Sequence, residues 1–243
     1  MIPIANPELT DAEKDHVLDV LDSGMIADGE EVREFEDEFA DYCGVSYGVA
    51  TSNGTTALHA ALEALGLGEG DTVLTTPFSF VATANAIRFA GATPVFADID
   101  PETFNLDPAA VERVAQERDV DAILAVHLYG LAAGIDRLQE IADEHNLSLI
   151  EDAAQAHGAE LDGQRVGSFG DVACFSFYPS KNMTTGEGGM VVTDDEMVAR
   201  NAAQFVNHGR SGAYKHETLG HNFRMTNVAA AIGREQLKKL PGY

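Results

Sequence analysis

The chain has 243 residues, of which 45% are hydrophobic, and its 40 acidic and 15 basic residues give a formal charge of −25. This length suffices for one large domain or two small ones with a substantial core, and the composition excludes a disordered chain. Such an acidic surface repels nucleic acid and anionic membranes, so we expect neither as a partner. Because the acids are spread along the chain and repel one another, we hypothesise adaptation to a salt-rich cytoplasm.

Helices and strands are predicted to alternate along the chain. Two amphipathic helices come first, over residues 10–23 and 30–43. Further helices are predicted over residues 53–65, 80–90, 108–118, 135–146, 194–205 and 225–239. Strands are predicted over residues 47–51, 71–77, 92–99, 121–128, 147–152, 171–177 and 188–194. This alternation indicates a mostly parallel α/β sheet with helices on both faces.

The N-terminal residues 1–14 contain neither the basic nor the apolar stretch of a signal peptide. No apolar run reaches the length of a membrane span. Cys43 and Cys174 lie far apart in apolar surroundings, so we expect two buried thiols in a reducing compartment. A cytoplasmic location is therefore predicted.

No metal site is predicted from the histidines. Their spacing matches no zinc-binding pattern, so we expect solvated or packed side chains at His127, His157, His208 and His221.

Polar residues follow several predicted strands at the point where each strand ends. Ligands bind at the carboxyl ends of parallel strands, so we expect these residues to share one edge of the sheet. They are residues 51–56, 75–80, 151–155 and 176–181, together with His127. The sequence therefore predicts one ligand site along this edge.

Asp152 ends an apolar strand and is a candidate for chemistry. A carboxylate buried there needs a cation or hydrogen-bond donors, because its ionisation is otherwise costly. Its partner is either a structural arginine or a ligand. Gln155 follows three residues later, where a helical turn would bring its amide beside Asp152.

The sequence SNGTT, residues 52–56, marks a turn from a strand into a helix. Free backbone N–H groups and the positive helix end favour phosphate there, while the same residue types also serve as ordinary N-caps. The turn is not a Walker loop, because no lysine follows at that spacing, and it lacks the dinucleotide glycine fingerprint. Thr55 is thus a candidate phosphate ligand.

Lys181 stands alone between a hydroxyl-rich turn and a glycine-rich one, just after an apolar strand. It is either an ordinary surface lysine or a lysine that takes part in the chemistry. Ser176 offers a hydroxyl five residues earlier, and the Phe80 ring either packs in the core or stacks on a flat ligand.

Pyridoxal 5′-phosphate (PLP) is the one ligand that would use all of these residues. Its phosphate would meet Thr55 and Ser176. Its ring nitrogen would meet Asp152, its flat face Phe80, and its aldehyde would form a Schiff base with Lys181. The combination is far more specific than any of its parts.

Five segments carry a resemblance to a known family. They are SNGTTALHAAL (52–62), PFSFVATANAI (77–87), EDAAQAHGA (151–159), residues 167–193 around FYPSKNMTTGEGG, and LGHNFRMTNVAAAIGREQL (219–237). They closely resemble the DegT/DnrJ/EryC1/StrS family of sugar aminotransferases. This resemblance implies the large domain of a type I PLP-transferase, the aspartate aminotransferase-like fold.

The resemblance implies a role for each matching residue. Lys181 is similar to the Schiff-base lysine that shuttles protons, and Asp152 to the partner of the pyridine nitrogen. Gln155 resembles a contact to the ring hydroxyl. The full set of implied catalytic and cofactor-binding positions is Gly54, Thr55, Phe80, Asp152, Gln155, Ser176, Lys181 and Asn222. Among them, Asn222 resembles the asparagine that reaches the cofactor phosphate of a partner subunit.

The family's activity implies amino transfer, usually from glutamate, to a keto group on a nucleotide-linked sugar, in a homodimer with shared active sites. Two alternatives stay open: a PLP-binding fragment or regulatory subunit without catalysis, and a PLP-dependent sugar dehydratase. Lys181 argues against the dehydratase, in which histidine replaces the lysine. Family members continue into a small C-terminal domain, so we expect residues 1–243 to be the PLP-binding large domain, with a helical segment over about 1–45 and the small domain absent.

Overall fold

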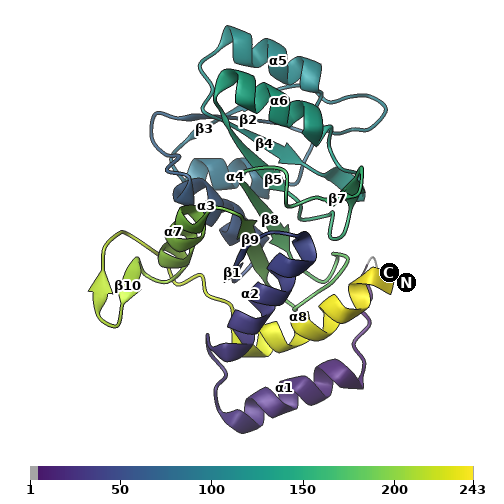
Figure 1. Cartoon of the computed structure of the whole chain (residues 1–243), viewed down its shortest axis with the longest axis vertical. Coiled ribbons are helices and arrows are strands. Elements are labelled where there is room, and N and C mark those ends of the chain that lie inside the picture. The colour runs from purple at the N-terminus through teal and green to yellow at the C-terminus, as the bar shows by residue number, and fades with distance from the viewer. Residues whose placement is uncertain (1–4, 243) are drawn as a thin grey trace.

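The computed structural model describes residues 5–242 and shows a sheet between two layers of helices (Figure 1). The sheet has seven strands in the order β1-β9-β8-β5-β4-β2-β3. They are β1 (Tyr47–Thr51), β2 (Thr72–Thr75), β3 (Thr93–Phe96), β4 (Ala122–Val126), β5 (Ser148–Asp152), β8 (Val172–Ser176) and β9 (Gly189–Thr193). Only β9 runs antiparallel to both of its neighbours, so the predicted mostly parallel α/β sheet is confirmed.

Helices cover both faces of this sheet, as predicted. They are α1 (Asp11–Ser23), α2 (Glu30–Cys43), α3 (Gly54–Ala64), α4 (Ala82–Phe89), α5 (Pro108–Glu117), α6 (Ile135–His145), α7 (Glu196–Val206) and α8 (Asn227–Lys239). One face packs against α3, α4 and α7, and the other against α2, α5, α6 and α8. The N-terminal helix α1 packs along α8 at the outside of the molecule (Figure 1).

The core is built by alternation along each strand. In β8, Cys174 packs on the α3 side of the sheet, while Ala173 and Phe175 pack on the α2 side. The Phe39 ring of α2 meets the Phe175 ring edge-on, with centroids 4.9 Å apart. Burying each such ring contributes roughly 1.5–3 kcal/mol. Cys43 and Cys174 are both buried free thiols, which confirms their predicted packing.

Short elements account for most of what the sequence did not predict. They are the 3-10 turns η1 (Leu128–Gly130) and η2 (Leu240–Gly242) and two hairpins, β6 (Glu160–Leu161) with β7 (Gln164–Arg165), and β10 (Arg210–Gly212) with β11 (Lys215–His216). The β10–β11 hairpin projects from the body beside α7 and is called the arm below (Figure 1). Strands of two or three residues are too short for a period-two pattern, so they escape prediction.

Most predicted elements extend one to three residues beyond the observed bounds, and two of them are examples. The strand predicted over residues 92–99 ends at Phe96, because its neighbour β2 ends at Thr75. The last hydrogen bond between the two strands is donated by the Ala97 amide to the Thr75 carbonyl. The helix predicted from residue 80 begins at Ala82.

The carboxyl ends of β4, β5 and β8 reach the same edge of the sheet, where α3 begins. Asn53 fixes that beginning, because its side chain accepts a hydrogen bond from the Thr56 amide at 3.0 Å. Within residues 5–242, the structure contains no helix of the length and apolarity needed to cross a membrane.

Candidate functional site

A cavity of about 660 Å³ lies at the carboxyl edge of the sheet. Its walls come from the start of α3, the start of α4, the end of β5 and the turn after β8. Seven of the eight residues predicted from sequence line it: Gly54, Thr55, Phe80, Asp152, Gln155, Ser176 and Lys181. The expected convergence of distant strand ends is therefore seen.

The start of α3 forms a cradle for an anion. Within the described residues, the backbone amides of Gly54 and Thr55 donate no hydrogen bond, and both residues line the cavity. A methyl group at Gly54 would lie 2.6 Å from Cβ of Ser176, so only glycine fits here without a shift. Two free amides at a positive helix end, beside the Ser176 hydroxyl, suit a phosphate.

Asp152 lies at the end of β5 with its carboxylate buried beneath the cavity. It accepts hydrogen bonds from the Thr83 hydroxyl at 2.8 Å and from the Ala154 amide at 3.3 Å. Burial raises the pKa of this carboxyl group, and the Thr83 hydroxyl opposes that shift. A cation placed against the carboxylate would restore its ionised form, which suits a protonated ring nitrogen.

Lys181 sits in the turn after β8, where its amide donates to the Tyr178 carbonyl at 2.9 Å. Its side chain is half-buried at the cavity wall. Burial lowers the pKa of its amine, and the negative charge of Asp152 partly offsets this. The amine is thus held closer to its neutral, nucleophilic form than a surface lysine would be.

Phe80 and Gln155 stand on two sides of the cavity. The Phe80 ring is 70% exposed and lies at the cavity mouth rather than in the core, so it is free to cover a flat ligand. The helical turn expected after Asp152 is wrong, because residues 153–156 form a tight turn closed by the Ala156 amide. The Gln155 side chain instead accepts a hydrogen bond from the Tyr129 amide at 3.0 Å.

Several residues at this cavity were not predicted from the sequence. Thr83 is buried and hydrogen-bonds Asp152, and its hydroxyl lies 2.7 Å from that of Ser79. Glu187 also lines the wall and was missed, whereas Tyr178, which lines it too, belongs to the expected edge segment 176–181. The spacing of Ser79 and Thr83, four residues apart near a helix start, was the available signal, but it does not reveal that α4 packs over β5.

His127 and Glu151 were expected near the same edge, and they form a pair below it. His127 Nε2 lies 2.9 Å from a Glu151 oxygen, and both side chains are fully buried. The other ring nitrogen, Nδ1, accepts the Ala133 amide at 3.0 Å, so Nε2 carries the proton and donates it to Glu151. The pair supports the strand ends and does not line the cavity.

Asn222 is the one predicted residue outside the cavity. It lies in an isolated bridge with Asn207, at the base of the arm, and is exposed. Its expected role in the site of a partner subunit therefore stays a prediction.

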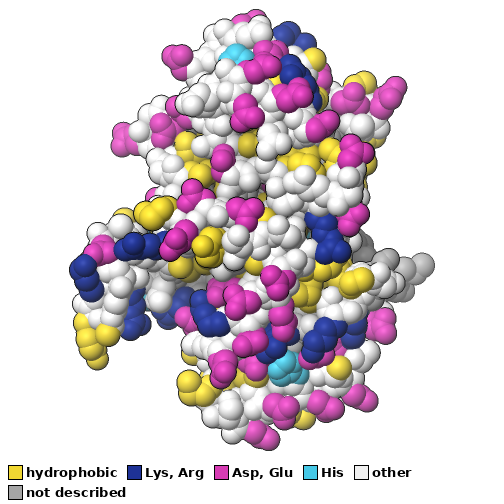
Figure 2. All heavy atoms as spheres, in the orientation of Figure 1, with side chains coloured by type: hydrophobic (Ala, Val, Ile, Leu, Met, Phe, Trp, Pro, Cys, Tyr) yellow, Lys and Arg dark blue, Asp and Glu magenta, His cyan; other side chains and the backbone are white. Residues whose placement is uncertain are grey.

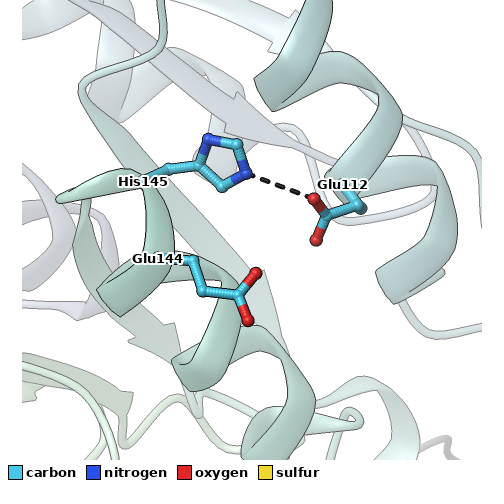
Figure 3. Close-up of side chains that lie close together, drawn as sticks. All are labelled: Glu112, Glu144 and His145. Atoms are coloured by element: carbon cyan, nitrogen blue, oxygen red, sulfur yellow. Dashed lines mark hydrogen bonds and ion pairs between the residues drawn. The ribbon is translucent and has the colours of Figure 1, made fainter.

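A histidine and two glutamates come together away from the cavity, between α5 and α6 (Figure 3). They are Glu112, Glu144 and His145, and the His145 ring lies 3.2 Å from a Glu112 oxygen. Arg137 already approaches both carboxylates, at 3.3 Å from Glu112 and 3.8 Å from Glu144. We therefore interpret the group as a surface ion-pair network. His145 is not one of the four histidines considered in the sequence.

Comparisons with known proteins agree with this geometry. The DegT/DnrJ/EryC1/StrS aminotransferase family model matches residues 7–243. GDP-perosamine synthase of Caulobacter vibrioides is 46% identical over 98% of this chain. A pleiotropic regulatory protein of Geobacillus stearothermophilus is 44% identical over 90% of it. The crystal structure of an aminotransferase from Psychrobacter cryohalolentis superposes with a TM-score of 0.92, at 42% identity over 98% of the chain.

These proteins are longer than the chain. It spans 65% of the GDP-perosamine synthase, 60% of the regulatory protein and 64% of the Psychrobacter aminotransferase chain.

Proposed function

Because the chain belongs to the DegT/DnrJ/EryC1/StrS aminotransferase family, we propose that it carries the cofactor site for amino transfer to a nucleotide-linked keto sugar. The donor in this proposal is an amino acid, glutamate first. Enzymes of this family depend on PLP, and the similarity to a GDP-perosamine synthase supports a nucleotide-linked sugar as the acceptor. The observation that carries the proposal is the meeting of Lys181, Asp152 and the Gly54 cradle in one cavity.

The cofactor, when bound, supplies an aldehyde that joins a lysine amine and a ring that accepts electrons from the donor's Cα–H bond. Gly54 and Thr55 would hold its phosphate through their backbone amides, with the Ser176 hydroxyl beside them. Asp152 would hold a proton at the ring nitrogen, and Thr83 would orient the carboxylate that does so. Phe80 would cover one face of the ring and exclude water.

Lys181 would carry both the covalent attachment and the proton transfers. Its lowered pKa leaves more of the amine uncharged near neutral pH, and an uncharged Nζ can accept the proton from the donor's Cα. The same Nζ would then deliver that proton within the cavity. The acceptor sugar would use the same residues in the reverse order, which predicts ping-pong kinetics.

Several wider features belong to the same proposal. We place residues 1–243 in the PLP-binding large domain and Asn222 at the cofactor phosphate of a second copy, in a homodimer with shared sites. A cytoplasmic enzyme in a salt-rich cell fits the charge of −25, and polysaccharide synthesis is the process proposed for its product.

A second candidate is a PLP-binding regulatory protein without amino transfer. The similarity to the pleiotropic regulatory protein of Geobacillus favours it. The two candidates differ in one property, since both bind the cofactor but only the first consumes an amino donor. The dehydratase alternative is weaker, because Lys181 occupies the position where such enzymes are expected to carry histidine.

The test is a visible absorption spectrum of the purified chain with PLP in high salt. We expect a band that borohydride removes and that Lys181→Ala lacks. Bleaching of that band by glutamate supports amino transfer, while a band that glutamate leaves unchanged supports the regulatory candidate. A folded protein with no band would contradict both.

A further inference from the structure

Ser79 and Thr83 carry hydroxyl groups that do not cap the helix beside them. Thr83 is buried in the first turn of α4, and Ser79 is half-buried four residues earlier. Both line the cavity at the carboxyl edge of the sheet, which we call the cofactor cavity. Serine and threonine near a helix start usually hydrogen-bond to the backbone. Here no side chain caps α4, and the two hydroxyl oxygens instead lie 2.7 Å apart.

Other buried threonines of the protein use their hydroxyls differently. The hydroxyls of Thr75, Thr184 and Thr193 donate to backbone carbonyls, at 2.8, 2.8 and 2.6 Å. Thr83 donates instead to the side chain of Asp152, at 2.8 Å, and so joins α4 to the end of β5. The backbone around Thr83 does not require this bond.

The direction of the two hydrogen bonds follows from the hydrogens available. An ionised carboxylate only accepts, so the single hydroxyl hydrogen of Thr83 points at Oδ2 of Asp152. Thr83 has no second hydrogen to give, and Ser79 therefore donates to Thr83. Both bonds run toward the carboxylate, and we call the arrangement the hydroxyl chain. The reverse direction, from a protonated carboxyl group, would lack charge assistance and be weaker.

Asp152 has little other support for its negative charge. Within the part of the chain that the structure describes, its carboxylate accepts one other hydrogen bond, from the Ala154 amide at 3.3 Å. Burial raises the pKa of the carboxyl group, and the Thr83 hydroxyl opposes that shift more than the Ala154 amide or the charges of Lys181 and His127 do. The Thr83 bond is thus the main local support of the ionised form.

The charge of the whole protein adds to the cost of ionising Asp152. The chain holds 40 acidic and 15 basic residues, and Figure 2 shows acidic side chains spread over the face in view. These charges disfavour one more, although salt screens those at the surface. Among the described residues, α3 and α4 place no titratable side chain in the cavity wall. The titratable groups around the carboxylate come from β4, β8, the turn after β8 and the start of β9: His127, Cys174, Tyr178, Lys181 and Glu187.

We propose that Ser79 and Thr83 are positioning residues that keep the Asp152 carboxylate ionised and aimed at the ring nitrogen of the cofactor. The proposal rests on the function proposed above, since it needs PLP in the cavity. Thr83 occupies Oδ2, which leaves Oδ1, with its long bond from Ala154, for the proton of the ring nitrogen. Ser79 acts only through Thr83, because hydrogen bonds in a chain strengthen one another.

The experiment measures the affinity for PLP by fluorescence titration over a range of pH values. Affinity should fall as the pH falls through the titration of Asp152, because a neutral carboxyl group no longer attracts a protonated ring nitrogen. Thr83→Val removes the chain and should move this fall to higher pH by about one unit. Thr83→Ser keeps a hydroxyl and should restore the wild-type curve. Ser79→Ala should move the fall by about 0.3 unit, in the same direction.

Three controls separate the chain from a packing effect. In the Thr83→Val protein, the further change Ser79→Ala should add no shift, because the chain is already broken. Thr193→Val removes the hydroxyl of a buried threonine at the opposite edge of the sheet and should leave the curve unchanged. A PLP analogue with carbon in place of the ring nitrogen should bind with the same pH dependence in the wild type and in Thr83→Val.

The outcomes distinguish this proposal from the function on which it rests. A folded wild type that binds no PLP would contradict the proposed function, and the chain with it. If PLP binds but the curves of the wild type and Thr83→Val coincide, or if the analogue shows the same shift as PLP, the chain does not control Asp152. Should Thr83→Val disturb folding, as judged by circular dichroism, a Ser79→Ala curve equal to that of the wild type would overturn the proposal.

Discussion

Charge is arranged differently in the cofactor cavity and among the arginines that lie between α2, α7 and the arm. In the cavity, Asp152 is buried and Lys181 half-buried, and burial shifts the pKa of each toward its neutral form. Beside the arm, Arg200 and Arg210 are exposed to solvent. Salt screens exposed charges far more than buried ones. The two regions therefore differ in what solvent allows: burial in the cavity can tune chemistry, whereas salt screens the arginines beside the arm.

The largest effect should come from removing the amine of the cavity. Lys181→Ala loses both the covalent attachment and the proton acceptor, so we expect the rate of donor consumption to fall about 10,000-fold. Stopped-flow absorbance with PLP and glutamate measures it. Lys14→Ala, at an exposed position of α1, should leave the rate unchanged. If the Lys181→Ala protein still consumes glutamate, the reaction does not depend on Lys181 in this cavity.

Next comes the buried carboxylate. Asp152→Asn keeps the shape and the Thr83 hydrogen bond but cannot hold a proton at a ring nitrogen by charge. We expect about a 1000-fold lower rate, with PLP still bound. Asp119→Asn, at an exposed loop position, is the control. Equal rates for the wild type and Asp152→Asn would mean that the carboxylate is only structural.

The next prediction concerns how burial of Glu36, on α2, makes the free energy of unfolding depend on pH. Burial raises its pKa from 4.5 to about 7, so between these values the native state keeps a proton that the unfolded state has lost. The free energy of unfolding should therefore fall as pH rises through this window, by about 3 kcal/mol, and change no further above it.

Glu36→Gln should remove this slope, because its amide still accepts the Ala50 N–H without titrating. Urea unfolding at about pH 5 and about pH 8 gives the difference between the variant and the wild type. Glu34→Gln, exposed on the same helix, should retain the wild-type slope. If the wild type and Glu36→Gln show parallel curves, burial does not control this carboxyl group.

The smallest effect concerns the cradle. Gly54→Ala places a methyl group 2.6 Å from Cβ of Ser176, and such overpacking costs about 1–3 kcal/mol. We expect PLP to bind about tenfold more weakly, as measured by fluorescence titration. Gly242→Ala, where a methyl group meets no atom within 4 Å, should bind PLP like the wild type. Unchanged affinity in Gly54→Ala would place the phosphate elsewhere.

The main elements of the fold were predictable because they depend on local periodicity. The apolar run of β4 and the amphipathic pattern of α6 fix their own structure. The arm was not predictable, because β10 and β11 contain too few residues for a pattern. The end of β3 was missed for another reason: it depends on where its neighbour β2 stops, which the local sequence does not record.

The residues of the candidate site also fall into a group that could be predicted from local sequence and a group that could not. Some site residues could be predicted from their own segments, because residue type and family resemblance are local: they are Lys181, Asp152 and Gly54. Thr83 was missed because its bond to Asp152 joins residues 69 apart in the chain and arises only when α4 packs over β5. The grouping of Arg33, Arg200, Arg210 and Arg224 around one pocket was equally unpredictable, since they come from α2, α7, the arm and the segment before α8.

The central claim, that Lys181 is the covalent anchor of the cofactor, is tested most directly by peptide mapping. The protein is incubated with PLP, reduced with borohydride, digested and analysed by mass spectrometry. We predict the reduced pyridoxyl group on the peptide that contains Lys181, at close to one group per chain. Labelling spread over exposed lysines such as Lys14 and Lys215, with Lys181 unmodified, would contradict the account.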